Sequence, residues 1–358
     1  MRERLQLYLN DWIPMKKTKI RNITITDLAK ILKLNTSTVS RALNNHPDIK
    51  EETKQKIKEL AQELNYIPNS IAQNLKNKTS NTIGVIVPGI HYHFFSQVIS
   101  GIEDVAFEHG YKVIVCQSRE NYEREVIYSK SLVQNKIAGL LISVSEKTED
   151  AAHLIDLQNK GIPVVFFDRP VEGIQASRVI NNDYEGAYQI TELLIQQGAK
   201  RIAHLSGNPQ LYICKERFRG FCAALKTYGL MVEDELVVNC GLDQINGYEG
   251  AKMLFESTKK PEALFCINDY VAVGAFQYLN EKNIKIPGEV SLSGFSNIPL
   301  ADLIKPSLTT IDQFPYKMGA EACKIIMDEI KSSSTLEPKT EIILTKLVIR
   351  ESTKKERS

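Results

Sequence analysis

Apolar residues along the chain follow two different spacings, and the change lies near residue 80. Up to that point they recur every three or four positions, which is the period of an amphipathic helix. Three short helices are expected, over residues 24–32, 35–43 and 51–64. Thr24 and Asn35 stand at the starts of the first two, and both residue types favour helix N-caps. This part of the chain is therefore expected to form a small all-α unit.

From Thr82 onward the pattern changes to near-continuous apolar runs separated by amphipathic stretches. Such runs are typical of strands in parallel sheets that helices cover on both faces. Residues 81–358 are too many for one such sheet, so an α/β core of two lobes with parallel sheets is expected. The expected strands are Ile83–Val87, Lys112–Cys116, Gly139–Ser143, Pro163–Phe167, Arg201–Leu205, Leu236–Asn239, Ala263–Ile267 and Val290–Ser293.

Charge is distributed unevenly between these two parts. Residues 15–80 carry 13 Lys or Arg against 6 Asp or Glu, a balance of +7, whereas the net charge of the whole chain is only +2. Residues 1–14 are neutral overall, so residues 81–358 carry a balance of −5. A small basic unit joined to a larger acidic one indicates a polyanion partner for the N-terminal part, although a solvated basic helix face would have the same composition.

Composition argues against several classes of protein. No stretch approaches the roughly 18 consecutive apolar residues that a membrane span needs, and residues 1–14 lack the apolar core of a signal peptide. The six cysteines form no C-x-x-C pair, which indicates reduced residues and not disulfides or a zinc site. We therefore expect a cytoplasmic protein without a cofactor or metal. Met15 opens a basic segment, so residues 1–14 are expected to be an unstructured extension.

The segment Ile25–Leu43 has the features of a helix-turn-helix. Two short helices would meet at a tight turn at Lys33 and Leu34, and the second would present small polar and basic residues outward. Entry into the DNA major groove requires a slim helix with hydrogen-bonding side chains near its N-terminus. The pattern alone leaves an ordinary helical hairpin as an alternative.

Further motifs give the chain a specific resemblance. They follow one order over roughly residues 20–352 and are Val39–Asn44, Leu64–Asn69, Ala72-Gln73-x-Leu75, Phe167–Arg169, Asp183–Gly186, Asn268–Asp269, Gly294–Phe295, Leu308–Thr310 and Leu347–Ser352. In these motifs the chain resembles the lactose-repressor (LacI/GalR) family of regulators. The resemblance implies a helix-turn-helix headpiece over residues 15–68, a hinge helix and linker over 69–80, and a core over 81–358 that binds an effector and dimerises.

The family core has the type I periplasmic-binding-protein fold, in which the chain crosses between two lobes. By this resemblance, lobe 1 is expected at residues 81–180 and 313–338. Lobe 2 is expected at residues 181–312 and 339–352. The effector is then expected in the cleft between the lobes.

Eight residues of the headpiece and the first hinge position match DNA-contacting positions of the family. Thr36, Ser37 and Arg41 match base-reading positions, and Arg41 can bond a guanine edge through two hydrogen bonds. The residues that match phosphate-contacting positions are Asn35, Thr38, Asn44, Tyr66 and Asn69. For Thr38 and Tyr66, packing in the headpiece interior is an alternative role.

Seven core residues match effector-binding positions of the family. They are Phe94, Phe95, Asp168, Arg169, Arg217, Leu242 and Asp269. An arginine fork and a carboxylate that face one cleft suit a polyol or a similar polar ligand. A helix-capping role for Asp269 and an ion pair between Asp168 and Arg169 are alternatives. Two residues depart from the family pattern: Leu242 stands where an aromatic ring is common, and Ser296 stands where an Asp is usual. A flat ring stacked at residue 242 is therefore not expected.

Together these features predict a sequence-specific, DNA-binding transcriptional regulator, expected to be a repressor, that is controlled by a small sugar-like molecule. A homodimer is expected because two headpieces related by a two-fold axis can read a palindromic operator in double-stranded DNA. Control by a protein partner, or the absence of any effector, is the alternative. The chain contains no G-x-S-x-G or H-E-x-x-H motif, so an enzyme is not expected.

The hinge yields the first testable prediction. Ala72 matches a position that packs on the minor-groove floor, and Leu75 matches an apolar wedge that unstacks a base step and kinks the DNA. The segment is too short to be a stable helix alone, so its folding on DNA would act as a switch, whereas an inert linker is the alternative. Leu75→Ala should weaken binding to the specific operator much more than binding to unrelated DNA, measured by titration at one salt concentration. An equal loss for both DNAs would refute the wedge.

Overall fold

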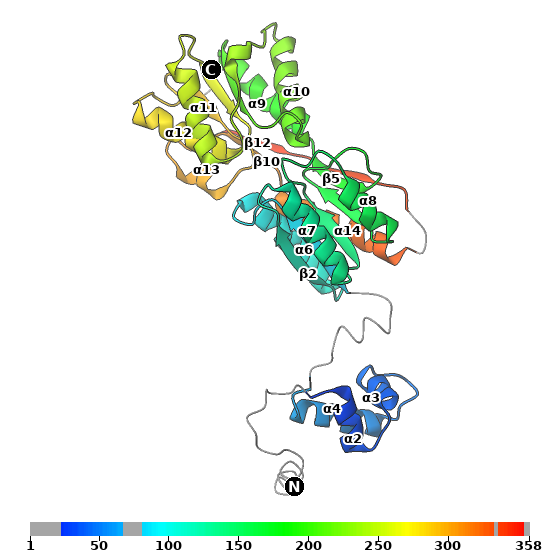
Figure 1. The fold of residues 1–358 in the computed structure, drawn as a ribbon. Coiled ribbons are helices and arrows are strands. Elements are labelled where there is room, and N and C mark those ends of the chain that lie inside the picture. Colours follow the sequence, from blue (N-terminus) through cyan, green and yellow to red (C-terminus); the bar gives the residue numbers. More distant parts are fainter. Residues whose placement is uncertain (1–22, 67–80, 333–335, 354–358) are drawn as a thin grey trace. The chain divides into compact units, whose positions relative to one another are not determined.

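The computed structural model describes residues 23–66, 81–332 and 336–353. The chain divides into two compact units, Met1–Thr79 and Ser80–Ser358. The predicted order of a small helical unit followed by a larger α/β core is confirmed (Figure 1). The expectations for the extension at residues 1–14 and for the hinge at 69–80 concern residues outside the described ranges.

The first unit is a bundle of the three predicted helices, which are α2 (Ile25–Leu32), α3 (Thr36–Leu43) and α4 (Glu51–Glu63). Thr24 caps α2: its hydroxyl accepts from the Asp27 amide, and the Asp27 carboxylate accepts from the Thr24 amide, so two otherwise unpaired donors of the first turn are satisfied. Lys33 then adopts a left-handed conformation that ends α2 and turns the chain into α3. The buried core of this unit consists of Leu28, Ala29, Val39, Ala42, Ile57 and Ala61.

The second unit contains two parallel sheets covered by helices on both faces. The sheet of lobe 1 has six strands in the order β11-β5-β4-β3-β1-β2, all parallel. Its strands are β1 (Thr82–Val87), β2 (Lys112–Gln117), β3 (Gly139–Ile142), β4 (Val164–Phe167), β5 (Ser177–Asn181) and β11 (Thr340–Ile343). Its helices are α6 (His93–Glu108), α7 (Tyr122–Gln134), α8 (Ala152–Asn159) and α14 (Pro315–Lys331). Alternate residues of β3 point to opposite faces: Leu141 packs with α6 and α14, and Leu140 with α7 and α8.

Lobe 2 repeats this architecture with a four-stranded parallel sheet in the order β7-β6-β8-β9. Its strands are β6 (Ile202–Ser206), β7 (Val237–Asn239), β8 (Ala263–Cys266) and β9 (Ser291–Ser293). Its helices are α9 (Asp183–Gln196), α10 (Tyr212–Thr227), α11 (Gln244–Glu256), α12 (Asp269–Glu281), the short α13 (Pro299–Leu303) and the 3-10 turn η1 (Asp234–Leu236). Among the described residues, no helix combines the length and the apolar character needed to cross a membrane.

Three segments carry the chain between the lobes, and hydrogen bonds join them to one another. They lie between β5 and α9, between β10 (Thr310–Asp312) and α14, and between β11 and β12 (Lys346–Val348). The Asn181 amide group donates to the carbonyls of Gln313 and Ile343, and its oxygen accepts from the Gln313 side chain, each at 3.0 Å. Because one buried side chain contacts all three crossings, their relative positions are fixed where the two lobes meet.

The structure corrects one predicted boundary. Residues 339–352 were expected in lobe 2, but β11 pairs in parallel with β5 and so extends the sheet of lobe 1 to Ile343. Only after Ile343 does the chain cross to lobe 2, where β12 pairs antiparallel with β10. β11 is a short edge strand with mostly exposed residues, so it lacks the apolar run that identified the buried strands.

Glycines allow two helices of lobe 1 to approach closely. A Cβ atom at Gly319 of α14 would overlap the carbonyl oxygen of Val98 in α6, and one at Gly101 of α6 would overlap the carbonyl oxygen of Tyr316. Each helix thus presents a glycine to the backbone of the other. This close contact brings Met318 and Ala322 into the buried core beside the sheet.

Gly319→Ala should therefore destabilise the core by about 1–3 kcal/mol, the usual cost of forcing extra atoms into a packed interior. The measurement is the denaturant dependence of unfolding, followed by circular dichroism. Lys317→Ala is the matched control, since Lys317 is exposed on the same helix and its truncation leaves the packing intact. Equal stability of the Gly319 variant and the control would contradict the close approach.

Candidate DNA-binding face and ligand cavity

The headpiece exposes one side of α3. Val39 and Ala42 face the core, and this places the predicted base-reading residues Thr36, Ser37 and Arg41 on the exposed side. Arg41 forms no hydrogen bond or ion pair with the described residues, so its guanidinium is available to a partner. A short helix with two small hydroxyl residues in its first turn and an exposed arginine one turn later suits contact with base edges.

The predicted phosphate-contacting residues have more varied surroundings. Asn35 precedes α3 and is exposed, with no side-chain hydrogen bond to the helix. Asn44 is exposed too, but its amide donates to the Ser40 carbonyl. Thr38 is partly buried, and Tyr66 packs against the headpiece core, which raises the pKa of its phenol through burial.

The packing role that was an alternative for Tyr66 is therefore present. Three further predicted DNA contacts, Asn69, Ala72 and Leu75, lie outside the described residues.

In the core, a cleft of about 470 Å³, its open mouth included, lies where the two lobes meet. The junction between two lobes is a usual position for a small-molecule ligand. Its lining contains six of the seven predicted effector residues together with seven others. The lining residues are Tyr92, Phe94, Phe95, Glu120, Asp168, Arg169, Ile213, Arg217, Leu242, Asn268, Tyr270, Ser296 and Gln313.

Arg217 on α10 is the most constrained residue of the lining, with only 2% of its surface exposed. Its Nε donates to Asp183 at 2.8 Å, its Nη1 donates to the Ile267 carbonyl at 2.6 Å, and its guanidinium lies 3.7 Å from the centre of the Phe295 ring. Burial raises the pKa of Asp183 to about 6, although Arg217 acts in the opposite direction. Arg217 is therefore both a lining residue and a structural ion-pair partner.

A second charged group lies at the end of β4 in lobe 1. Asp168 adopts a left-handed conformation with φ 61°, and Arg169 then donates to Glu120 at 2.9 Å. The Arg169 Nε lies 3.5 Å from an Asp168 oxygen, so the ion pair that was an alternative role for these two residues is present. Burial raises the pKa of Asp168, while Arg169 and Arg217 oppose that rise.

Three polar groups of the lining have no hydrogen-bond partner among the residues that the structure describes. They are the Asp168 carboxylate, the Tyr92 hydroxyl and Nη2 of Arg217. The first accepts, the second accepts or donates, and the third donates. A ligand that carries several hydroxyl groups could pair with all three.

Asp269 is the one predicted effector residue that the structure places outside the lining. It is fully buried: its carboxylate accepts from the Thr310 hydroxyl at 2.6 Å and from the Ile298 amide at 2.9 Å. Burial raises its pKa to about 6, while the Thr310 hydrogen bond lowers it. Its oxygens bind the chain after β9 and are not directed at the cleft, so the prediction of a ligand contact is corrected. The helix cap proposed as its alternative belongs to Asn268, which accepts from the Val271 amide.

Sequence reasoning missed several lining residues. Tyr92 and Tyr270 pack edge to face with ring centres 5.2 Å apart, and Glu120 forms the ion pair with Arg169. Glu120 follows β2 and Tyr270 begins α12 after β8, so their positions after strand ends could have drawn attention to them. Gln313 could not have been found this way, because it lies in a chain crossing.

Direct hydrogen bonds also join the two lobes across the cleft. The His93 amide at the start of α6 donates to the Tyr270 hydroxyl at 3.0 Å. The Asn208 side chain, after β6, donates to the Glu146 carbonyl at 3.1 Å. Both contacts depend on the lobes being close together.

A helix-turn-helix with an exposed arginine and a two-lobed α/β core with a polar cleft define a DNA-binding regulator with a ligand-binding domain. Comparison with known proteins agrees. Residues 24–69 match the model of the lacI family of bacterial regulatory proteins. Residues 80–351 match the model of periplasmic binding proteins and the sugar-binding domain of the LacI family. The chain belongs to the LacI family of transcriptional regulators.

Individual relatives cover three quarters or more of the chain. The HTH-type transcriptional repressor PurR of Vibrio atlanticus (strain LGP32) is 34% identical over 308 residues, which cover 86% of this chain and 92% of that protein. The lac repressor dimer bound to operator and the anti-inducer ONPF shares the fold, with a TM-score of 0.82 and 23% identity over 93% of this chain and 99% of the other. A LacI family regulator from Enterococcus faecium with bound ribose has a TM-score of 0.69 and 27% identity over 76% of this chain and 98% of the other.

The Arg217–Asp183 pair gives a pH-dependent prediction. Arg217→Met should cost about 3–5 kcal/mol near pH 7.5, because it leaves the Asp183 charge buried without a partner. A carboxyl with a raised pKa binds its proton more tightly in the folded chain. Its contribution to stability is therefore full below the usual aspartate pKa of 3.8 and is lost as pH rises through the folded-state pKa of about 6. Near pH 5 Asp183 is largely protonated, and the difference between the two proteins should shrink.

Urea unfolding of both proteins at the two pH values measures this effect. Arg219→Met on the same helix is the control, because Arg219 is exposed and its ion pair with Glu216 lies at the surface. A stability loss that is the same at both pH values would contradict the role assigned to Asp183.

Proposed function

We propose that this protein is a homodimeric repressor whose affinity for a palindromic operator is controlled by a neutral, sugar-like ligand bound between the core lobes. The ligand class rests on three groups of the cleft lining that have no hydrogen-bond partner among the described residues: the Asp168 carboxylate, the Tyr92 hydroxyl and Nη2 of Arg217. An acceptor and two donors in one small space match a polyol, in which each hydroxyl both donates and accepts.

The charges around the cleft also favour a neutral ligand. The lining residues Arg169 and Arg217 are already paired, with Glu120 and Asp183 respectively. The carboxylate of Asp168 adds a further negative charge, so no cation is left over to neutralise an anionic ligand. A phosphate or carboxylate would have to displace one of these buried pairs, which is costly.

The relatives support the same proposal. The regulator from Enterococcus faecium was crystallised with ribose, and the lac repressor was crystallised as a dimer on its operator. The curated relatives are named as transcriptional repressors, which are not enzymes. We assign the same non-enzymatic role to this chain and expect it in the cytoplasm, where it meets chromosomal DNA.

Selection of genomic fragments by the purified full chain, at near-physiological salt, tests the DNA-binding half of the proposal. One short palindrome should be enriched, and Arg41→Ala should weaken binding to it by about 1–3 kcal/mol while relaxing the preference at one base pair of each half-site. Lys33→Ala is the control, since Lys33 is exposed in the turn and outside the base-reading set. Binding that is sensitive to salt and indifferent to sequence would refute the proposed specificity.

A panel of neutral sugars and their phosphates, added to the enriched operator complex, tests the ligand half. A neutral sugar should change operator affinity and raise the unfolding temperature of the core. A response restricted to phosphorylated sugars would refute the charge argument. No response to any small molecule would favour control by a protein partner.

A further inference from the structure

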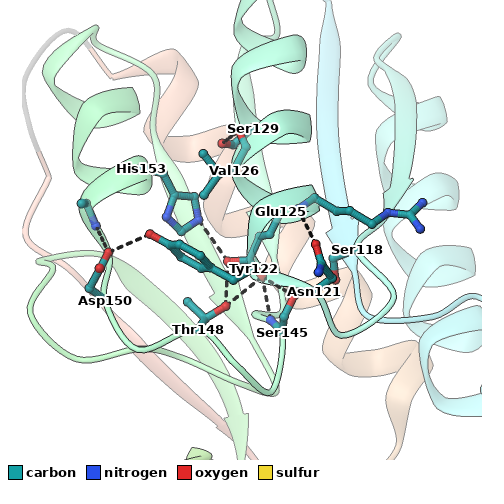
Figure 2. A network of polar contacts seen from close by, with 12 residues as sticks. Ser118, Asn121, Tyr122, Glu125, Val126, Ser129, Ser145, Thr148, Asp150 and His153 are labelled. Atoms are coloured by element: carbon teal, nitrogen blue, oxygen red, sulfur yellow. Dashed lines mark hydrogen bonds and ion pairs between the residues drawn. The ribbon is translucent and has the colours of Figure 1, made fainter.

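Glu125 occupies the centre of a polar network in lobe 1 (Figure 2). It lies on α7 and has 0% of its surface exposed. One carboxylate oxygen accepts from the Ser145 amide at 2.6 Å and lies 2.7 Å from the Ser145 hydroxyl. The other accepts from the Thr148 hydroxyl at 3.0 Å and lies 3.0 Å from Nε2 of His153. Every donor comes from residues 145–153, the segment that follows β3.

The surroundings of His153 indicate how its ring pairs with Glu125. Its Nδ1 is buried and has no hydrogen-bond partner among the described residues, while Nε2 faces Glu125. A doubly protonated ring would leave an N–H group buried without an acceptor, so the geometry favours a neutral ring that donates through Nε2. Tyr122 packs edge-on against this ring and donates to Asp150, which also accepts from the Ala152 amide (Figure 2). Glu125 is thus held as an acceptor for several donors of one loop.

The same loop reaches the ligand cleft through its next residue, Glu146. The Glu146 amide donates to Glu120 at 2.7 Å, and Glu120 is the partner of Arg169 in the cleft lining. The Glu146 carbonyl accepts the cross-lobe hydrogen bond of Asn208. One peptide segment therefore contacts the cleft on one side and the opposite lobe on the other.

We propose that Glu125 is a positioning residue that fixes the loop over residues 143–151 so that Glu146 links the ligand cleft to closure of the two lobes. The inference rests on the proposed function only in taking the cleft to be the effector site. Glu125 contacts no lining residue directly. It acts through Ser145, whose amide is adjacent to the one that contacts Glu120.

A buried carboxylate suits this role better than apolar packing would. Apolar contacts are not directional and do not fix the position of a loop, whereas hydrogen bonds to a carboxylate are short and oriented. A shift of the loop would move Glu146 away from both Glu120 and Asn208. Loss of Glu125 should therefore loosen the lobes, although it lies outside the cleft.

The amide of His93 provides a direct measure of lobe closure. It belongs to the first turn of α6, where an amide has no partner within the helix, and its hydrogen bond goes to Tyr270 of the other lobe. Its exchange with deuterium should therefore require the lobes to separate. The Ser145 amide reports the Glu125 contact itself in the same experiment.

In the full-length protein without added ligand, Glu125→Ala should speed exchange of the Ser145 amide and of the His93 amide, each by about tenfold or more, as expected when a hydrogen bond to a charged acceptor is lost. Glu123→Ala, an exposed position on the same helix, is the control and should change neither amide. Faster exchange at Ser145 with an unchanged His93 would overturn the proposal, because Glu125 would then only hold its own loop. Unchanged exchange at both amides would overturn it as well.

Two further variants separate positioning from a general loss of stability. Glu125→Gln keeps the shape of the side chain but retains only one acceptor oxygen. It should therefore speed exchange of the Ser145 and His93 amides, while the buried amide of Val85 in β1 exchanges as in the parent. Faster exchange at Val85 too would mean a structural role only. Asn208→Ala should also speed exchange of the His93 amide. In the double variant with Glu125→Ala, the increase in the His93 exchange rate should be smaller than the two single effects combined, because both residues act through Glu146. Full additivity would contradict the shared route.

These outcomes are independent of the sugar panel. If no sugar binds but exchange of the His93 amide depends on Glu125, the ligand assignment fails and the proposed coupling of Glu125 to lobe closure stands. If sugars bind and exchange of the His93 amide is unchanged in the Glu125 variants, the proposed coupling fails and the ligand assignment stands.

Discussion

The core depends on the hydrogen bonds by which Asn181 joins the three chain crossings. Its single amide group contacts Gln313 and the Ile343 carbonyl, residues more than 130 positions away in the sequence. Because these crossings are the covalent connections between the sheets, fixing them sets where the two lobes can meet. The cleft lies at this junction, and Gln313 belongs both to a crossing and to the lining. Any movement of one lobe against the other must therefore be accommodated close to the ligand.

Within that frame, charged residues of the cleft serve structure and recognition together. Arg217 neutralises Asp183, binds the chain just after β8 through the Ile267 carbonyl and stacks on Phe295, and it also lines the cleft. Asp168 and Arg169 are held at the end of β4 by a left-handed turn and by Glu120. Such pairing keeps buried charges from destabilising the core. It also leaves the lining residues without an unpaired cation, which is why we propose a neutral polar ligand.

The polar network around Glu125 extends this principle beyond the lining. A buried acceptor organises a loop whose next residue contacts Glu120 on the cleft side and Asn208 on the other lobe. Ligand contacts and lobe closure then share one segment of backbone. A loop held by hydrogen bonds has discrete arrangements. A regulator with two states needs such an element to respond to its ligand.

The sequence by itself determined the elements whose signals are local. The capping residue Thr24, the helical period of the headpiece and eight apolar strands depend on neighbours in the chain, and the structure has these elements close to their expected bounds. The family motifs likewise placed six residues of the cleft lining. Only the tertiary structure decided the roles that depend on distant partners. β11 joins lobe 1 because β5 lies beside it, and Asp269 binds Thr310 and Ile298 instead of facing the cleft. Tyr92, Glu120 and Gln313 enter the lining, and Glu125 finds its donors, through contacts between separate elements. The partner of a buried polar group is chosen by packing in three dimensions, and its own sequence position does not reveal it.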